Sequence, residues 1–456
     1  MKGRKLLICL IMVIALWKNT EAVKTDSSDS DVDHETAQGS ARDSSNENAR
    51  NKPSISRGKY PPGFTLDDRP GKVRRVMVSR LESAVEGQYL VKVLNNVTNR
   101  EVIRALASAG IRRPRRFKFG IRRTSNLILL KKISEDQIRT LQENTDVFEI
   151  IEPDLITTVT QCTSYSTSGD LSWGLDRLDS PVNEDSFDNK LKMSSSGTGA
   201  GVDAYVVDTG INKDHEDFGG RVTYGYSITS TAADDNGHGT HVAGILGGTK
   251  YGVAKGANII AVKVIRSDGS GTSSDFLGGL EWIQKQVSAA QRKSVVNVSL
   301  RWPHSKAVNS AVAGLVDSGI VMVVAAGNDG SDACEYSPGS EEEALCVGGT
   351  NWFDQAVPEY NNGPCVDIYA PAVFIESDAN WANNATEEKS GTSMACPFVA
   401  GAAASYLSEV SETVPSMELV QKAKNKIFEN AANIVTFNGI STDQKSDYNR
   451  LLQLKC

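Results

Sequence analysis

The sequence lacks several features that would place the chain outside the globular class. It contains no internal repeat, and its 39% apolar and 23% charged residues exclude a mainly disordered, collagen-like or polytopic membrane protein. It also lacks an excess of positive charge, because 49 Lys and Arg stand against 56 Asp and Glu, and a net charge of -7 does not favour nucleic-acid binding. The length of 456 residues exceeds one typical domain, so we expect two folded units.

The N-terminal apolar segment is too short to cross a bilayer. Lys2, Arg4 and Lys5 precede an apolar run over residues 6–17, and the run is followed by Thr20-Glu21-Ala22. A membrane span needs about 20 apolar residues, so a cleaved signal peptide over residues 1–22 is favoured over an anchor. We predict a secreted, extracellular protein with no membrane span after signal removal.

Cysteine is absent between residues 10 and 161. Cys9 leaves with the signal peptide, and the mature part keeps six cysteines, an even number that permits three disulfides in an exported domain. They are Cys162, Cys334, Cys346, Cys365, Cys396 and Cys456.

Residues 23–161 divide into two segments of different composition. Residues 23–71 are rich in Asp, Ser, Asn and Arg and lack apolar periodicity, so we predict a disordered linker. From 72 to 161 the pattern predicts a small α+β unit, with strands at 89–93, 127–131 and 147–151 and helices at 100–109 and 134–143.

Charge separates this unit from the rest of the chain. Residues 72–161 contain 17 Lys and Arg against 10 Asp and Glu, a balance of +7, whereas residues 162–456 contain 21 against 36, a balance of -15. The basic run at 112–116 has a nucleic-acid-binding interpretation. In an exported chain we favour complementarity to an acidic neighbour.

From residue 203 onward, short apolar runs alternate with helical patterns. This alternation predicts an α/β fold with a doubly wound, mainly parallel sheet and helices on both faces. The expected strands are 204–207, 259–264, 295–298, 320–325 and 344–347, and the expected helices are 238–247, 274–291, 306–318, 393–408 and 416–430.

Three local patterns carry chemistry. Asp208 ends an apolar strand, His238 begins a helix between glycines in Asn236-Gly237-His238-Gly239-Thr240-His241, and Ser393 begins another helix in Ser390-Gly391-Thr392-Ser393-Met394-Ala395. Alone, each has an ordinary structural interpretation as a helix cap or a satisfied polar residue. Together they give Asp, His and Ser in the chain order of subtilisin.

On these motifs the chain resembles the subtilisin family of serine proteases, and specifically its proteinase K-like subfamily. The resemblance runs from about Trp173 to about residue 410 and includes Tyr251-Gly252-Val253-Ala254-Lys255-Gly256 and Ala325-Ala326-Gly327-Asn328. It implies a subtilisin-like peptidase domain over residues 162–456, preceded by an inhibitory prosegment over 72–161. The implied activity is that of a serine endopeptidase made as a zymogen.

The resemblance assigns roles to single residues. Ser393 would attack the scissile carbonyl, His238 would take its proton, Asp208 would orient the imidazole, and Asn328 would stabilise the oxyanion with the nucleophile's backbone N–H. No cofactor is expected for catalysis. His241 does not make a metal pair with His238, because zincin helices use a spacing of four with an intervening Glu.

The substrate-binding strand departs from the family pattern. Where the family has Ser-Leu-Gly-Gly, this chain has Ser299-Leu300-Arg301-Trp302. We expect these two large side chains to stand at the subsite wall and to narrow specificity, with Arg301 favouring acidic side chains. The resemblance predicts a substrate-binding set of Ser270, Gly271, Ser299, Leu300, Arg301, Ala325, Ala326 and Gly327.

The resemblance also implies stabilising sites. Asp367 matches a calcium ligand of the subfamily, with carbonyls near Glu342 and Ala344 as further oxygens, so structural Ca²⁺ is expected. A surface acidic cluster is the alternative. Cys334 and Cys365 resemble a known disulfide pair. Cys162 and Cys456 are candidates to join the ends of the mature chain, and Cys346 and Cys396 either pair or stay free.

Three further expectations concern proteolytic processing, glycosylation and oligomeric state. The extended, β-branched tail over 152–160 suits strand addition in the active-site cleft. The resemblance implies self-cleavage near Thr160, between Thr158 and Cys162. The sequons at Asn96 and Asn384 are candidate N-glycosylation sites. The sequon at Asn297 lies on a predicted core strand, so we expect no glycan there. We expect a monomer acting on protein and peptide substrates; the rival hypothesis is a catalytically silent peptide-binding or adhesion module.

Overall fold

The computed structural model describes residues 64–67, 72–78, 84–111, 117–118, 126–158, 172–179, 191, 193–194, 196–442 and 444–455. These residues all belong to one compact unit spanning 57–456. The predicted signal peptide, the basic run at 112–116, Cys162, Cys456 and the predicted cleavage window after Thr158 lie outside the described residues. Among the described helices, none is both long and apolar enough to cross a membrane.

Within the described residues, nine strands form the main sheet, in the order β19-β20-β16-β15-β13-β11-β7-β9-β8. Every neighbouring pair is parallel except β19 with β20. The strands are β7 (Asp203–Asp208), β8 (Val222–Ser227), β9 (Asn258–Lys263), β11 (Ser294–Val298), β13 (Val321–Ala325), β15 (Leu345–Thr350), β16 (Ile368–Pro371), β19 (Ala432–Asn433) and β20 (Arg450–Leu451).

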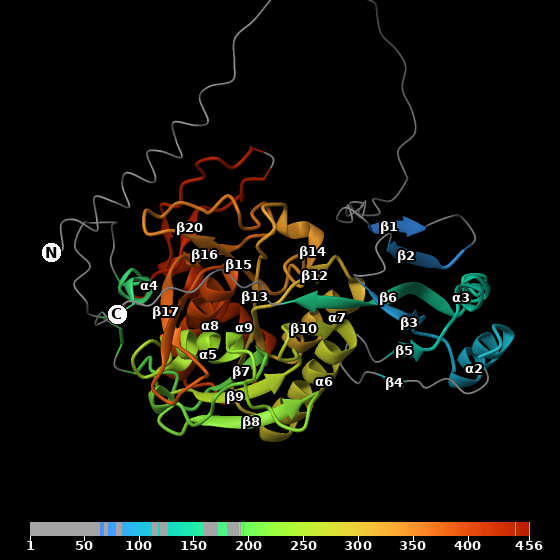
Figure 1. Ribbon diagram of the computed structural model, residues 1–456, viewed down its shortest axis with the longest axis horizontal. Coiled ribbons are helices and arrows are strands. Elements are labelled where there is room, and N and C mark those ends of the chain that lie inside the picture. The colour runs from blue at the N-terminus through green and yellow to red at the C-terminus, as the bar shows by residue number, and fades with distance from the viewer. Residues whose placement is uncertain are drawn as a thin grey trace, which may run out of the picture. The chain divides into compact units, whose positions relative to one another are not determined.

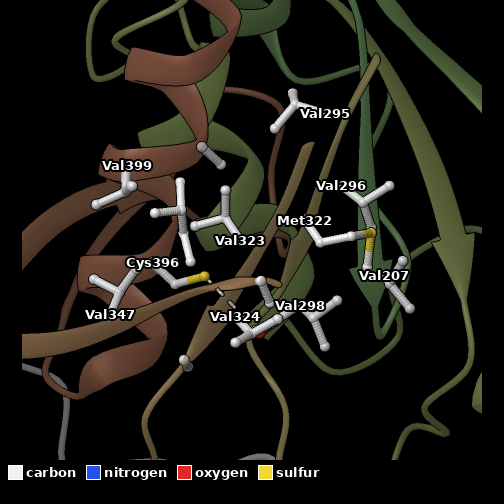
Figure 2. Close-up of a cluster of buried hydrophobic side chains, with 14 of the residues drawn as sticks. Val207, Val295, Val296, Val298, Met322, Val323, Val324, Val347, Cys396 and Val399 are labelled. Atoms are coloured by element: carbon white, nitrogen blue, oxygen red, sulfur yellow. Dashed lines mark hydrogen bonds between the residues drawn. The ribbon is translucent and has the colours of Figure 1, made fainter. Parts of the chain in front are cut away.

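Helices cover both faces of this sheet, as predicted (Figure 1). They are α5 (His238–Gly247), α6 (Ser273–Ala290), α7 (Lys306–Val316), α8 (Thr392–Glu409) and α9 (Met417–Asn430). Figure 2 shows why the central strands are almost wholly apolar, because they bury side chains on both faces: Val323 and Val347 lie toward Cys396 and Val399 of α8, whereas Val296, Met322 and Val207 lie on the other side. A strand covered on both faces has no solvent-facing side chains, so it reads as an uninterrupted apolar run.

The N-terminal α+β unit has its own sheet, in the order β1-β2-β6-β3-β5-β4, and its own core, which includes Val91, Leu130, Ile138 and Ile151. Its elements are β1 (Phe64–Asp67), β2 (Arg74–Val78), β3 (Ala84–Val93), α2 (Asn99–Ser108), β4 (Phe117–Lys118), β5 (Leu127–Lys131), α3 (Glu135–Leu141) and β6 (Phe148–Thr158). Both helices begin with a capping box, at Thr98 and at Ser134.

The first and last strands of this unit extend the predicted pattern. β1 pairs antiparallel with β2, although it lies inside the segment predicted to be a disordered linker up to residue 71. Four residues are too few for a periodic signal, and the pairing partner supplies the order. The strand predicted over 147–151 and the tail predicted to be extended over 152–160 form one strand, β6, up to Thr158, and the end of β6 pairs antiparallel with β10 (Ser270–Thr272).

The remaining elements are short. They are α4 (Trp173–Asp176), β12 (Trp302–Pro303), β14 (Tyr336–Ser337), β17 (Ile375–Asp378), β18 (Thr386–Lys389) and the 3₁₀ turns η2 (Glu216–Phe218) and η3 (Ala333–Glu335).

Candidate active site

Asp208 and His238 form a buried pair at the carboxyl end of β7. Asp208 is 0% exposed and His238 is 1% exposed. The ring Nδ1 of His238 lies 2.8 Å from Oδ1 and 2.9 Å from Oδ2 of Asp208, and the backbone N–H of Thr209 donates to Oδ1 at 2.7 Å. The carboxylate holds Nδ1, and Nε2 has no hydrogen-bond partner among the described residues. This arrangement leaves one imidazole nitrogen free to accept a proton.

Asp234, which the sequence analysis did not single out, holds the start of α5. Its Oδ1 accepts hydrogen bonds from the backbone N–H groups of Asn236 (3.0 Å) and Gly237 (2.9 Å), and its Oδ2 accepts from that of Thr240 (2.9 Å). Gly237 has φ 108°, a left-handed conformation that favours glycine. The sequence signal is an Asp four residues before the His, which alone does not distinguish a cap from surface charge.

Ser393 lies in the first turn of α8, and α8 packs directly against α5. Its hydroxyl donates to the carbonyl of Ser299 at 3.2 Å, and the hydroxyl of Ser299 donates to the carbonyl of Ser393 at 3.1 Å. The side chain is only 3% exposed. The N-terminal end of a helix favours negative charge, so it suits a developing oxyanion beside Ser393.

Thr392 orients Asn328. The backbone N–H and the hydroxyl of Thr392 both donate to Asn328 Oδ1, at 2.9 and 3.0 Å, and the Thr392 hydroxyl accepts from the N–H of Gly327 at 3.1 Å. With Oδ1 held by two donors, the amide group of Asn328 is left to donate elsewhere. Sequence analysis predicted Asn328 but not the residue that positions it.

Asn361 fixes the loop that carries Asn328. It is fully buried; its Nδ2 donates to the carbonyl of Ala326 (3.0 Å), its Oδ1 accepts from Asp329 N–H (2.9 Å), and its own N–H donates to the carbonyl of Gly327 (2.9 Å). No motif surrounds Asn361 in the sequence, so only its long-range contacts identify this role.

Seven of the eight predicted substrate-binding residues fall into two groups. One group lines a small pocket together with Ser393, Asn328 and Thr392; it comprises Ser299, Leu300, Arg301, Ala325 and Gly327. The other group, Ser270 and Gly271, lies on β10 and pairs with β6 instead. Ala326 is buried, and its carbonyl accepts from Asn361.

Of the two residues that depart from the family pattern, Arg301 and Trp302, only Arg301 lines the pocket. The Arg301 guanidinium pairs with Asp329 and lies 5.0 Å from the ring centre of Tyr336. Trp302 is 0% exposed and packs against Phe276, with ring centres 4.6 Å apart. Trp302 therefore does not form a subsite wall, contrary to the prediction, because its side chain enters the core. The charge of Arg301 already has a carboxylate partner, which weakens the basis for an acidic preference.

The residues predicted to stabilise the fold have distinct environments. The Cys334–Cys365 disulfide is present, as predicted, whereas Cys346 is buried and free. Cys396 is also buried and free. Asp367 accepts a hydrogen bond on Oδ2 from the N–H of Cys346 at 2.9 Å, and burial raises the pKa of its carboxyl.

His241 is buried and faces backbone carbonyl groups. Its Nε2 faces the carbonyls of Ile375 and Glu387 at 3.0 and 3.1 Å, and burial lowers its pKa well below the ordinary value. The described residues contain no group of three or more His, Cys, Asp or Glu that could hold a metal ion.

Comparisons with known proteins agree with this fold. Residues 199–448 match the model of the Subtilase family. The chain is 41% identical over 335 residues to the subtilisin-like serine protease Pen c 2 of Penicillium citrinum, covering 70% of this chain and 72% of that protein. It is 43% identical over 257 residues to an extracellular serine proteinase of Thermus sp. strain Rt41A, covering 56% and 61% respectively.

A crystal structure of a cold adapted subtilisin-like serine proteinase superposes with a TM-score of 0.56 at 38% identity, covering 63% of this chain and 100% of that one. The family match spans more than half of the chain, and the fold has the sheet order and helices described above. The chain is therefore a member of the subtilase family and a serine protease.

Proposed function

We propose that the chain is a secreted serine endopeptidase that cleaves peptide bonds with Asp208, His238, Ser393 and Asn328. The observation that carries this proposal is the buried Asp208–His238 pair, whose free Nε2 belongs to a helix packed against the helix that carries Ser393 in its first turn. Asp208 lies at the end of an apolar strand, and His238 and Ser393 lie at the starts of helices. Each of the three groups is therefore held by a rigid element.

In the proposed reaction, the Ser393 hydroxyl turns from the Ser299 carbonyl to Nε2 of His238 and loses its proton as Oγ attacks the substrate carbonyl. Asp208 keeps the Nδ1 proton in place and stabilises the imidazolium. The Asn328 amide and the Ser393 N–H stabilise the oxyanion. His238 then protonates the leaving amine, and a water molecule repeats the sequence to release the acyl group.

We also infer that the α+β unit is an inhibitory prosegment of this enzyme. The end of β6 pairs antiparallel with β10, which carries two of the predicted substrate-binding residues, and the Thr157 hydroxyl donates to the carbonyl of Arg301. The tail thus lies between two segments that would hold an extended substrate. A tail held beside the predicted substrate-binding residues supports inhibition before maturation.

Two buried carboxylates of β6 support the same inference. Glu152 accepts from the N–H of Ala307 (2.8 Å) and the hydroxyl of Ser305 (3.1 Å) at the start of α7. Asp154 accepts from the N–H and the hydroxyl of Ser274 at the start of α6. Each carboxylate satisfies donors that a helix N-terminus leaves open, so the unit is built to cover these two helix ends.

The test is a fluorophosphonate label followed by mutation. The label should attach to the parent but not to Ser393→Ala, while Ser288→Ala, an exposed serine of α6, should label normally. Ser393→Ala should remove peptidase activity and leave a folded precursor. Asn328→Leu should lower turnover by roughly 10²–10³-fold, the cost known for the oxyanion-hole asparagine of subtilisin itself. Labelling that persists in Ser393→Ala, or an unlabelled parent, would favour the silent binding module.

A further inference from the structure

The ammonium group of Lys424 lies among the backbone carbonyls of a turn far away in the sequence. Lys424 belongs to α9, and its Nζ donates to the carbonyls of Glu343 at 3.2 Å, Ala344 at 3.3 Å and Glu342 at 3.5 Å. The turn leads directly into β15. An ammonium has three N–H donors, so one side chain accounts for three converging carbonyl oxygens.

The charges around Lys424 favour a cation at this position. The carboxylates of Asp367, Glu343 and Glu341 all raise its pKa, although burial has the larger effect and lowers it. Asp367 is partly buried just before β16, where its Oδ2 accepts a hydrogen bond from the N–H of Cys346. Three carbonyl oxygens and the nearby Asp367 carboxylate form an acceptor-rich site that favours positive charge.

These oxygens are the ones at which Ca²⁺ was expected. The expected ligands were Asp367 and carbonyls near Glu342 and Ala344, and the latter two now accept hydrogen bonds from Lys424. Calcium takes six to eight oxygen ligands at about 2.3–2.6 Å. An ammonium and a calcium ion cannot share those carbonyls, so the residues present do not fit a calcium ion here while Lys424 holds its position.

We propose that Lys424 is a built-in cation that replaces calcium at this site and ties α9 to the turn before β15. A tethered ammonium is always present, so it removes the need for a free ion. The stability that this site contributes should therefore be insensitive to chelators. A lysine also carries one charge where calcium carries two, which suits a site where Asp367 is the one carboxylate among the expected ligands.

Lys422 provides a matched control on the same helix. It forms ion pairs with Glu412 and Glu418 at 2.7 and 2.9 Å, and its side chain is 42% exposed. Exposed pairs of this kind contribute little to stability. Replacing either lysine with Met removes the same charge and preserves helix propensity, so any difference between the two variants reflects the surroundings of the ammonium.

The experiment measures apparent melting temperature at a constant scan rate, on the full chain with Ser393→Ala to prevent self-digestion, in excess EDTA and in millimolar Ca²⁺ or Mg²⁺. The parent should melt within about 1 °C in all three. Lys424→Met should melt roughly 3–8 °C lower, because it leaves the carbonyls without a charged donor, and Lys422→Met should stay within about 1 °C of the parent. Lys424→Ala should be destabilised in EDTA and recover by several degrees in Ca²⁺ but not in Mg²⁺.

Three results would overturn the proposal. One is a parent stabilised by Ca²⁺ whose response disappears in Asp367→Asn, because the ion would then bind despite Lys424. Another is a Lys424→Met variant whose melting temperature equals that of Lys422→Met. The third is a Lys424→Ala variant that gains nothing from Ca²⁺, because the vacated position would then not be a cation site. If the Lys424 variants do not fold, calorimetric titration of the parent decides: no Ca²⁺ heat supports the proposal, and heat lost in Asp367→Asn refutes it.

Discussion

Glu152 should make inhibition by the proposed prosegment weaken as pH rises. In the complex this carboxyl is 1% exposed, and burial raises its pKa from an ordinary 4.5 to about 7, although hydrogen bonds from Ala307 and Ser305 oppose the shift. A carboxyl whose pKa is higher in the complex than in free solution binds its proton on association. Its contribution to affinity is thus fully present below about pH 4.5 and is lost as pH rises through about 7.

The two pKa values fix the size of the effect. For a free pKa of 4.5 and a bound pKa of about 7, proton linkage predicts that the inhibition constant rises roughly tenfold between pH 6 and pH 8. Burial also raises the pKa of Asp154, from 3.8 to about 6, which adds only about twofold over the same range. Glu152 should therefore dominate the pH dependence.

The assay is slow-binding inhibition of the mature enzyme by added residues 72–161, with the inhibition constant determined at each pH against a peptide substrate. Glu152→Gln cannot titrate, so its inhibition constant should vary only about twofold between pH 6 and pH 8. Asp136→Asn, whose side chain is 91% exposed on α3, should keep the parental profile. A Glu152→Gln profile that parallels the parent, or tighter inhibition at higher pH, would refute the reasoning.

Two further predictions concern specificity and stability. Arg301→Gly should enlarge the pocket beside Ser393 and raise the kcat/KM of substrates with bulky side chains roughly tenfold or more relative to small ones; identical peptide-library profiles would show that Arg301 does not limit access. Replacing both Cys334 and Cys365 with Ser should lower the free energy of unfolding by about 3–4 kcal/mol, as expected for a cross-link between residues 31 positions apart, and a guanidinium midpoint equal to the parent's would contradict this.

The sequence alone determined the elements that carry the candidate active site. The predicted helix at 238–247 coincides with α5, and Asp208 ends β7 as the strand pattern predicted. Buried parallel strands are continuous apolar runs, and the two helices of the site begin directly after a glycine, Gly237 or Gly391. Local signals of this kind require no knowledge of the partner segment.

The tertiary structure decided what each side chain contacts. Trp302 was expected at a subsite and lies in the core, and Asn361, which has no motif, holds the Asn328 loop. Lys424 meets carbonyls about 80 positions earlier, and Glu152 caps a helix about 155 positions later. Such contacts join segments that the sheet order brings together, and they depend on the direction of each side chain in space. Residue types and spacing define elements, whereas only packing determines which donor reaches which acceptor.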